Sequence, residues 1–246
     1  MKADSLKDLL KGSTGSIAVL GKGLSGRAVE DLLNKEGYAY DVFDQKDKWF
    51  GRGNARKCSL VITSPGFPPS HEWIKLAKDE GRMIITELDL GMCYSRARSL
   101  VGITGTNGKT SLATILSHVA NNLDLPSIAL GNIGHPLSSA EASGKTIGKN
   151  IFLETSSFQA CQSSVLRLDS LLWTNFSPDH LDYHLSEREY FLAKLKLANR
   201  CKNSNNVWIG ESVVSNAQKF GISLNPNFQV VPTLSEKAIP SHVDPF

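Results

Sequence analysis

Two glycine-rich turns constrain the fold of this chain more than any other feature, because each leads from an apolar run into a helical stretch. The turn Gly21–Gly26 separates the apolar run Ser16–Leu20 from the helical pattern Ser25–Glu36. The turn Gly102–Ser111 leads in the same way into the helical pattern Lys109–Asn121. A strand that passes through a tight turn into a helix begins a βαβ unit. Two such starts predict an α/β protein with two mostly parallel sheets, each covered by helices.

The alternation of strand and helix continues in both halves of the chain. We expect further strands at Tyr38–Phe43, Leu60–Ser64, Met83–Thr86, Leu100–Thr104, Ser127–Leu130, Asn150–Glu154, Ser170–Thr174 and Asn206–Ile209. We expect two further helices, at His71–Glu80 and Glu187–Asn199, and little regular structure from Asn225 onward. The polar stretch Tyr94–Arg98 divides the two series. It predicts a Rossmann-like unit over residues 1–95 and a mostly parallel α/β unit with a phosphate-binding loop over residues 96–246.

Composition excludes several classes of protein. Of the 246 residues, 41% are hydrophobic and 21% are charged, as in soluble globular proteins. No apolar run approaches the ~18 to 20 residues that cross a bilayer, and the first residues lack the apolar core of a secretion signal. The four cysteines are scattered, and a net charge of +3 is too small to predict nucleic-acid binding. We therefore expect a cytoplasmic monomer without membrane insertion, whose ligands are small molecules.

The first turn, Gly21-Lys-Gly23-Leu-Ser-Gly26, matches the pattern G-x-G-x-x-G between a strand and a helix. Its glycines permit a tight turn and a close approach of the backbone to a diphosphate at a helix N-terminus. Asp44, at the end of the next strand, is placed where such folds contact a ribose. NAD is one candidate ligand, and glycines that only permit close packing of helix on sheet are another interpretation. A UDP-sugar is favoured, because no later segment indicates hydride chemistry.

The second turn contains Gly108-Lys109-Thr110, the end of a phosphate-binding loop. In such a loop backbone N–H groups surround phosphates, the lysine reaches the β- and γ-phosphate oxygens, and the hydroxyl binds Mg²⁺. The strict pattern G-x-x-x-x-G-K-[ST] requires glycine at position 103, where this chain has Ile103. The preceding glycine is Gly102, so the pattern fails by one residue while the order of strand, loop and helix is kept. The turn therefore predicts an ATP site.

Five segments, in order, resemble the Mur ligases, and the first also resembles the related folylpolyglutamate synthetases. They are Thr104–Thr110 (TGTNGKT), Gly131–Gly134 (GNIG), Glu154–Gln159 (ETSSFQ), Asn175–Asp182 (NFSPDHLD) and Tyr190–Lys194 (YFLAK). Five matches within residues 104–194 are highly specific. The resemblance implies an ATP-dependent ligase of peptidoglycan precursor synthesis that activates a carboxylate as an acyl phosphate and joins it to an amino acid.

The first turn narrows the resemblance within the family. Residues Gly21–Ala28 read GKGLSGRA, which resembles the G-x-G-x-S-G-x-A of the members that add D-glutamate to UDP-N-acetylmuramoyl-L-alanine. Members that add L-alanine usually read G-G-x-G-M-S there, and those that add L-lysine or diaminopimelate begin with a different domain. Folylpolyglutamate synthetases lack a Rossmann-like first domain. The implied substrates are therefore ATP, UDP-N-acetylmuramoyl-L-alanine and D-glutamate.

The resemblance also implies roles for single residues in the ATP and metal sites. The implied ATP loop comprises Gly105, Thr106, Asn107, Gly108, Lys109, Thr110 and Ser111. Two Mg²⁺ ions are implied, with ligands from Thr110, Glu154, His180 and a carbamylated Lys194. The implied catalytic residues are Lys109, His180 and Lys194.

These residues differ in what they indicate without the resemblance. Glu154 ends an apolar strand, and a single carboxylate beside phosphate oxygens suits Mg²⁺, although a surface ion pair is the alternative. His180 alone would be interpreted as a surface histidine, and Lys194 as a solvated helix lysine. His184 lies near the motif but does not match it, so it is not a predicted site residue.

The substrate residues implied by the resemblance are Leu24, Ser25, Asp44, Gly66 and Asn132. Gly66 belongs to the break Thr63–Gly66, which places small polar groups at the carboxyl edge of the first sheet, where open α/β sheets bind ligands. Positions 45 and 46 are Gln and Lys, where the family commonly has Thr and Arg. Lys46 can meet a phosphate as a point charge but lacks the bidentate fork of arginine.

The chain also departs from the family pattern. It contains neither the S-G-x-H-N-x-x-N segment nor the third domain that brings the incoming amino acid, so we expect weak or absent ligation by this chain alone. A non-catalytic module that binds a UDP-sugar or ATP is one alternative, and another Mur-type ligase is a second. A nicotinamide-dependent dehydrogenase is a third, based on Gly21–Gly26 alone. Retention of Lys109, Glu154, His180 and Lys194 together favours the ligase.

Overall fold

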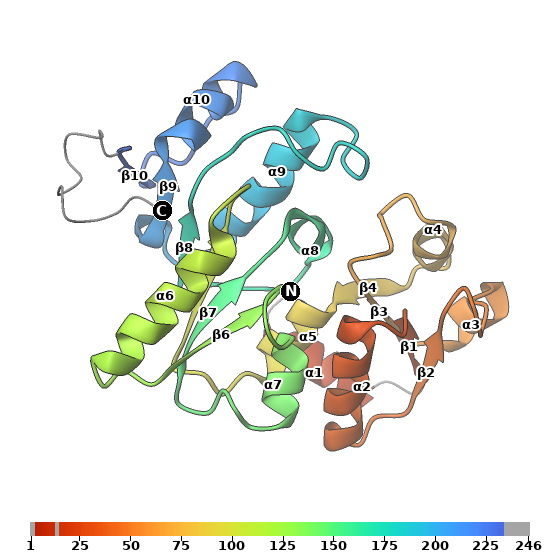
Figure 1. Ribbon diagram of the computed structural model, residues 1–246. Coiled ribbons are helices and arrows are strands. Elements are labelled where there is room, and N and C mark those ends of the chain that lie inside the picture. Colours follow the sequence, from red (N-terminus) through yellow and green to blue (C-terminus); the bar gives the residue numbers. More distant parts are fainter. Residues whose placement is uncertain (1–2, 13–14, 234–246) are drawn as a thin grey trace.

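The computed structural model describes residues 3–12 and 15–233 (Figure 1). The strands are β1 (Ile17–Leu20), β2 (Tyr40–Phe43), β3 (Leu60–Thr63), β4 (Met83–Thr86), β5 (Ser99–Thr104), β6 (Ser127–Gly131), β7 (Asn150–Glu154), β8 (Ser170–Trp173), β9 (Val207–Gly210) and β10 (Gln229–Val231). The α-helices are α1 (Ala3–Gly12), α2 (Leu24–Glu36), α3 (Arg52–Lys57), α4 (Glu72–Asp79), α5 (Glu87–Tyr94), α6 (Lys109–Asn122), α7 (Leu137–Ala142), α8 (Ser157–Gln162), α9 (Glu187–Ala198) and α10 (Glu211–Lys219). A short 3₁₀ helix covers Ser204–Asn206.

The strands form two sheets, and every strand pair in both is parallel. The first sheet has the order β2-β1-β3-β4 and the second the order β10-β9-β8-β5-β7-β6. In both, the first strand of the series lies inside the sheet, so the chain reverses its direction of travel beside it. Ligands of open parallel sheets bind at such a reversal, outside the carboxyl ends of the strands. The predicted α/β fold class with parallel sheets is confirmed.

Helices cover both faces of the first sheet because its strands are apolar on both sides. Ile17 and Val19 of β1 pack with apolar side chains of α1, α2 and α5. Ala18 and Leu20, which point to the opposite face, pack with side chains of α3 and α4. A strand that is buried on both faces is typical of parallel sheets, and all four residues of β1 are buried.

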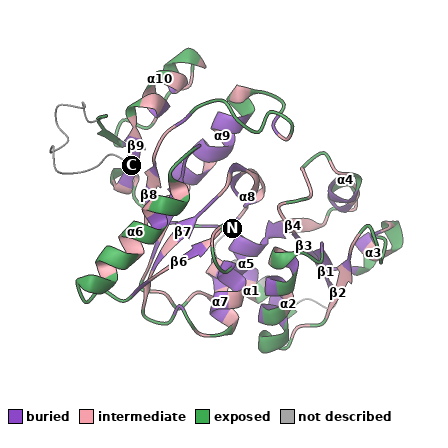
Figure 2. Cartoon of the chain, in the orientation of Figure 1, coloured by how far each residue is buried: buried purple, intermediate pink, exposed green. Residues whose placement is uncertain are grey.

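The second sheet is covered on one face by α8 and α9, whose side chains share a core with β5, β7 and β8. Helix α6 lies against β6 and β7 on the other face and is mostly exposed (Figure 2). Phe191 contacts both Trp173 and Phe176 in this core, with Phe176 and Phe191 edge to face at 5.1 Å between ring centroids. This packing fixes α9 against β8 and therefore fixes the side chains that α9 directs to the edge of the sheet.

The expected helices and strands are present with ends that differ by one or two residues, and six helices were not predicted. These are α1, α3, α5, α7, α8 and α10, of 6 to 10 residues each. Such short helices hold fewer than three turns, and α5 is buried over most of its length, so no amphipathic period marks it. The tail predicted to lack structure contains β10, and its residues 234–246 lie outside the described part of the chain.

The carboxylate of Asp89 joins the two sheets at the start of α5. Asp89 is fully buried and accepts hydrogen bonds from the backbone N–H and the hydroxyl of Thr86, both at 3.0 Å. From the segment after α8 it accepts bonds of 2.7 to 2.8 Å, donated by the hydroxyl of Ser163 and by the N–H groups of Ser164, Val165 and Leu166. This segment leads from α8 to β8 of the second sheet, and Thr86 is the last residue of β4 in the first sheet. The carboxylate of Asp89 therefore connects the two sheets.

A second contact between the sheets involves α7. Glu87 is buried, and its Oε1 accepts a 2.6 Å hydrogen bond from the N–H of Ser138. Burial raises the pKa of this carboxyl group to about 7. The ammonium group of Lys35 on α2 donates to the carbonyl oxygen of Glu141 at 2.9 Å. Helices α2, α5 and α7 therefore form one layer between the sheets (Figure 1).

We expect Asp89→Asn to reduce the free energy of unfolding by about 3 kcal/mol or more, because the new amide would turn N–H groups toward N–H donors and leave them buried without acceptors. Urea unfolding monitored by circular dichroism measures this change. Asp41→Asn is the matched control, since Asp41 is half-exposed in an ion pair with Lys48 and its replacement should cost about 0.5 kcal/mol or less. Equal losses in the two variants would contradict the role of Asp89.

Candidate functional site

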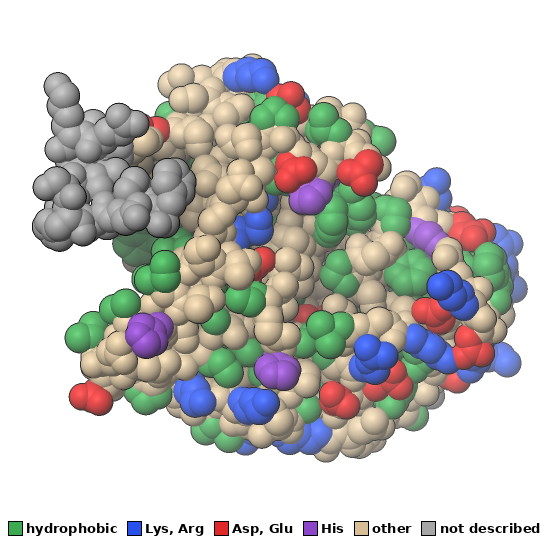
Figure 3. Space-filling view, viewed as in Figure 1, with side chains coloured by type: hydrophobic (Ala, Val, Ile, Leu, Met, Phe, Trp, Pro, Cys, Tyr) green, Lys and Arg blue, Asp and Glu red, His purple; other side chains and the backbone are tan. Residues whose placement is uncertain are grey.

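The polar residues predicted for the ATP and metal sites gather at the carboxyl edge of the second sheet. The strand order β8-β5-β7-β6 brings the loop after β5 between the ends of β8 and β7. Asn132 follows β6 and Glu154 ends β7, and the two strands are paired so that Gly131 lies beside Glu154. On this face the surface is hollowed, with basic and acidic side chains in and around the hollow (Figure 3).

The loop between β5 and α6 is held in a conformation that requires glycine at two positions. Gly105 has φ 154° and Gly108, which precedes the first residue of α6, has φ 78°. A Cβ atom on Gly105 would also overlap the hydroxyl oxygen of Thr174. The loop therefore lies directly against the end of β8, and helix α6 begins at Lys109 with its first N–H groups facing the edge.

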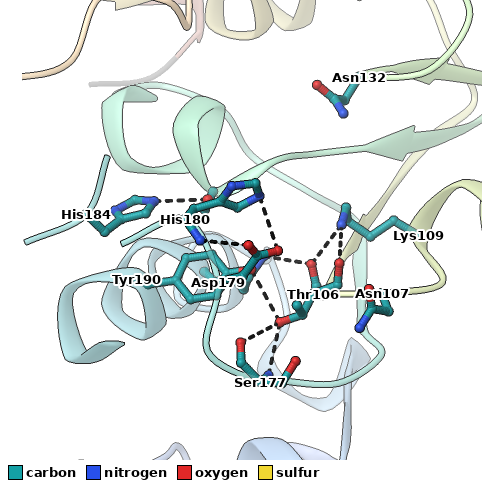
Figure 4. Close-up of polar contacts among 12 residues, drawn as sticks. Thr106, Asn107, Lys109, Asn132, Ser177, Asp179, His180, His184 and Tyr190 are labelled. Carbon is teal, nitrogen blue, oxygen red and sulfur yellow. Dashed lines mark hydrogen bonds and ion pairs between the residues drawn. The ribbon is translucent and has the colours of Figure 1, made fainter. Parts of the chain in front are cut away.

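Two lysines converge on one carbonyl oxygen of this loop. The ammonium group of Lys109 donates to the carbonyl oxygens of Gly105 at 3.0 Å and Thr106 at 2.7 Å (Figure 4). The ammonium group of Lys194, from the middle of α9, donates to the same Gly105 oxygen at 2.8 Å. One neutral carbonyl oxygen is thus the shared acceptor of two lysine side chains, and the positive charge of Lys109 favours a negatively charged ligand at the edge.

Lys194 is not the solvated lysine that its helical position suggests. Its side chain is 1% exposed, and its Nζ lies 4.6 Å from the centre of the Tyr190 ring. Burial, together with the positive charge of Lys109, lowers its pKa from the ordinary 10.5 to about 7. A substantial share of Lys194 therefore carries a neutral amine at neutral pH.

Glu154, Thr110 and Asn132 form a hydrogen-bonded chain beside the loop. The hydroxyl of Thr110 donates to Glu154 Oε2 at 2.6 Å, and the amide of Asn132 donates to Glu154 Oε1 at 3.0 Å. Glu154 is 2% exposed, and each of its carboxylate oxygens accepts a hydrogen bond from a neutral side chain. A buried carboxylate with a hydroxyl next to a phosphate-binding loop has the oxygen donors that Mg²⁺ prefers.

His180 lies in the loop after β8, where its ring is close to those of Phe158 and Tyr190. It has a φ of 52° and its Nε2 lies 3.6 Å from Asp179 Oδ2. Its ring packs on Phe158 with 4.8 Å between ring centroids. Tyr190 is next to it, with a hydroxyl 3.3 Å from the hydroxyl of Thr106 (Figure 4). The structure brings His180 to the same edge as the phosphate loop, but not into hydrogen-bonding contact with Glu154 or Lys194.

His184 was left out of the predicted site, yet the structure places it beside that site. It is buried, and its Nε2 lies 3.0 Å from the hydroxyl of Ser157 on α8. Burial and the nearby positive charge of Lys194 lower its pKa. Spacing alone gave one signal: His180 and His184 are four residues apart, so a turn of backbone brings them together, as the 2.9 Å bond from the His184 N–H to the His180 carbonyl shows.

The residues fit one divalent cation as they stand and a second only after a chemical change. Thr110 and Glu154 supply oxygen atoms at one position. Residues 3–12 and 15–233 contain no cluster of three or more His, Cys, Asp or Glu side chains that would hold an ion. Mg²⁺ prefers oxygen ligands, and neither an ammonium group nor a neutral amine offers one, so Lys194 suits a second ion as a carbamate.

Two of the four substrate residues predicted in the first unit line a cavity of about 330 Å³ at the carboxyl edge of the first sheet. Asp44 and Gly66 line it, together with Lys22, Lys46 and His71. The cavity lining does not include Leu24 or Ser25, which lie in the first turn of α2, and Leu24 is 60% exposed.

Asp44 orders the loops of this cavity. Its two carboxylate oxygens accept hydrogen bonds at 3.1 Å, one from the N–H of Lys22 and the other from the N–H of Lys46. These bonds lower the pKa of Asp44. The glycine turn and the loop after β2 are therefore tied to one carboxylate. Lys22 and Lys46 border the cavity, and the ammonium group of Lys22 forms an ion pair with Asp47.

Gln162, a residue without a predicted role, lies between the two groups of site residues. Its amide donates to the carbonyl oxygen of Phe67 at 2.5 Å and to the hydroxyl of Tyr183 at 2.8 Å. Phe67 lines the first cavity, and Tyr183 follows His180 in the loop after β8. The two edges are thus joined through a single side chain at the end of α8.

Comparison with known proteins identifies the family. The family model described as Mur ligase middle domain matches residues 103–231, which is more than half of the chain. The chain belongs to the Mur ligase family. The five segments that resembled the Mur ligases lie within or next to this match, so the predicted family is confirmed.

Curated relatives of this Mur ligase chain are described as UDP-N-acetylmuramoylalanine–D-glutamate ligases. The protein from Chlamydia pneumoniae is 30% identical over 213 residues, which cover 79% of this chain and 50% of that protein. The one from Rickettsia bellii is 35% identical over 219 residues, covering 85% of this chain and 45% of that protein. The chain spans about half the length of the curated relatives it matches.

A solved structure supports the fold. The UDP-N-acetylmuramate:L-alanyl-gamma-D-glutamyl-meso-diaminopimelate ligase from Neisseria meningitides superposes with a TM-score of 0.56 at 13% identity. The match covers 89% of this chain and 78% of that one. At this identity the likeness concerns the fold alone. Within the described ranges of this Mur ligase chain, no helix is long and apolar enough to span a membrane.

We expect Lys194→Met to stabilise the protein at pH 7 and below, with an advantage that shrinks as the pH rises. The folded-state pKa of Lys194 is about 7, against an ordinary 10.5. Between these values the unfolded chain binds more protons, so the free energy of unfolding of the wild type rises with pH, by up to about 1.4 kcal/mol per pH unit. Urea unfolding across this range measures the difference. Lys75→Met, at an exposed lysine, is the control, and a difference between wild type and Lys194→Met that is independent of pH would contradict the burial effect.

Proposed function

We propose that this chain carries the ATP, metal and nucleotide-sugar sites of a Mur ligase that adds D-glutamate to UDP-N-acetylmuramoyl-L-alanine. The observation that supports this most is the convergence of Lys109 and Lys194 on the Gly105 carbonyl beside the Thr110–Glu154 pair. It combines a cation for phosphate oxygens, Lys109, with oxygen donors for Mg²⁺ and with a buried lysine that can be modified. Phosphoryl transfer needs mainly such positioning and charge neutralisation.

The proposed roles follow the geometry of each side chain. Lys109 binds phosphate oxygens of ATP, and Thr110 and Glu154 hold one Mg²⁺, which neutralises charge on those oxygens. Asn132 orients the carboxyl end of the acceptor, because its amide already contacts Glu154 at 3.0 Å. His180 and a carbamylated Lys194 hold a second ion. The carboxylate of the muramyl peptide receives the γ-phosphoryl group, and the amine of D-glutamate then displaces phosphate from the acyl phosphate.

The lowered pKa of Lys194 supports its proposed modification. A neutral amine attacks the carbon of CO₂, the C–N bond forms, and the amine loses one proton to give the carbamate. An ordinary lysine is almost entirely protonated at pH 7, whereas the pKa of Lys194 is about 7. The product is an anion, which would also relieve the repulsion between Lys194 and Lys109.

The assignment of substrates rests on the first unit and on the relatives. We propose that residues 1–95 bind the UDP-sugar and residues 96–246 bind ATP, since the two sheets occupy these two parts of the chain. The cavity bordered by Lys22 and Lys46 suits the diphosphate. The names of the relatives from Chlamydia pneumoniae and Rickettsia bellii support D-glutamate as the amino acid that is added.

We expect the chain to bind UDP-N-acetylmuramoyl-L-alanine and, separately, Mg²⁺-ATP, as measured by isothermal titration calorimetry. Lys109→Ala should weaken Mg²⁺-ATP binding by about 100-fold, since it removes a charged contact to phosphate, and should leave the muramyl nucleotide unaffected. Lys75→Ala at an exposed site is the matched control. Binding of NAD that the muramyl nucleotide does not displace would overturn the proposal, as would the absence of binding to both ligands.

We expect the protein, incubated with ¹³C-bicarbonate, to show a carbamate carbonyl resonance in its ¹³C NMR spectrum. Lys194→Arg should abolish the resonance, because a guanidinium group stays protonated and does not react. Lys196→Arg, two residues further along α9, keeps Lys194 and should retain it. A resonance that persists in Lys194→Arg would place the modification elsewhere, and its absence from the wild type would remove the second metal ligand.

A further inference from the structure

We propose that Asn175 is a positioning residue, which sets the conformation of the phosphate loop and couples that loop to the loop that carries His180. The proposal rests on the proposed function, because it concerns how the ATP site is held in place. Asn175 directly follows β8, the strand next to β5. It touches no predicted metal ligand, and the motif that contains it assigns it no task.

The side chain of Asn175 makes three hydrogen bonds to the backbone of the phosphate loop. Its Oδ1 accepts from the N–H of Thr106 at 3.1 Å and from the N–H of Asn107 at 2.9 Å. Its Nδ2 donates to the carbonyl oxygen of Asn107 at 3.1 Å. The hydroxyl of Thr174 donates to the same carbonyl oxygen at 2.9 Å. Both polar groups of the Asn107 backbone are therefore bound by the end of β8.

These bonds decide which backbone groups face a phosphate. A phosphate-binding loop acts through N–H groups that have no other acceptor. Those of Thr106 and Asn107 already bond to Asn175. The N–H groups that remain for phosphate oxygens are those of Gly108 and of the first turn of α6, whose direction depends on the left-handed φ of 78° at Gly108. Asn175 binds the backbone of Asn107, the residue immediately before Gly108.

A second pair of hydrogen bonds connects the phosphate loop, residues 105–111, to the segment that carries His180. The hydroxyl of Thr106 donates to the carbonyl oxygen of Ser177 at 3.1 Å, and the N–H of Ser177 donates back to that hydroxyl at 3.1 Å (Figure 4). Asn175 and Ser177 therefore lie on the segment that leads to His180, and each is bonded to the loop that holds Lys109. A shift of one loop must shift the other, so phosphate contacts and the position of His180 change together.

The test compares Asn175→Ala with Asn121→Ala, a matched control on the far end of α6. The side chain of Asn121 also makes three hydrogen bonds to backbone groups. Its Nδ2 donates to the carbonyl oxygens of Ser117 and Ser127, and its Oδ1 accepts from the N–H of Ser127. Each variant thus loses three bonds between an asparagine side chain and the backbone. We expect similar losses of thermal stability, measured by calorimetry, and different losses of ligand binding.

Isothermal titration of the full chain with Mg²⁺-ATP should show a Kd about 10- to 100-fold higher for Asn175→Ala than for wild type, because misplaced donors lose most of their value. Asn121→Ala should change this Kd by less than about threefold, since distant sites act independently. The Kd for UDP-N-acetylmuramoyl-L-alanine should be unchanged in both. Thr106→Val, which removes the bonds to Ser177, should also weaken Mg²⁺-ATP binding.

The outcomes distinguish failure of the positioning role of Asn175 from failure of the proposed function. If wild type binds Mg²⁺-ATP and Asn175→Ala binds it equally well, the role of Asn175 is refuted while the proposed function stands. If both asparagine variants weaken ATP binding in proportion to their loss of stability, Asn175 acts only through general stability and the proposal is again refuted. If wild type fails to bind Mg²⁺-ATP, the proposed function fails and the positioning role falls with it.

Discussion

The arrangement of the two sheets depends on the solvation of one buried carboxylate. Asp89 accepts hydrogen bonds from Thr86 at the end of the first sheet and from residues 163–166 of the second unit. A buried charge without such donors would cost far more than the fold can supply. The two parts of the chain must therefore meet at α5 for either to be stable there. Gln162 adds a second connection, from Phe67 at the first cavity to Tyr183 in the loop after β8.

The candidate site itself depends on the parallel order of the second sheet. Lys109 begins α6 and Lys194 lies in α9, on opposite faces of the sheet, yet both reach the carbonyl group of Gly105 at its edge. Burying the Lys194 ammonium group beside a second lysine is unfavourable, and its lowered pKa reflects first its burial and then the charge of Lys109. The packing of Trp173, Phe176 and Phe191, which holds α9 on β8, compensates for it.

The sequence predicted the longer elements and the family well, because strand–turn–helix patterns and motifs are local. It missed α5, α7 and α8, which are short and are stabilised by contacts with distant residues. It also could not show that Lys194 is buried, that His184 contacts Ser157, or that Gln162 bonds to Phe67, since each depends on residues that the fold brings together. The strict phosphate-loop pattern requires glycine at position 103, and the chain has its glycine at position 102 instead, for a simple reason. Gly102 lies within β5, where a side chain would collide with Leu168 and Leu171, so it serves packing and not phosphate binding.

The attachment of the phosphate loop to the end of β8 has a consequence for its motion. Glycine-containing surface loops usually open by themselves, at little cost in free energy. Here the backbone of Asn107 is bonded to Thr174 and Asn175, and the hydroxyl of Thr106 to Ser177. The loop can open only when the edge of the sheet opens with it. We therefore expect the amide groups of this loop to exchange with solvent more slowly than those of an unattached surface turn.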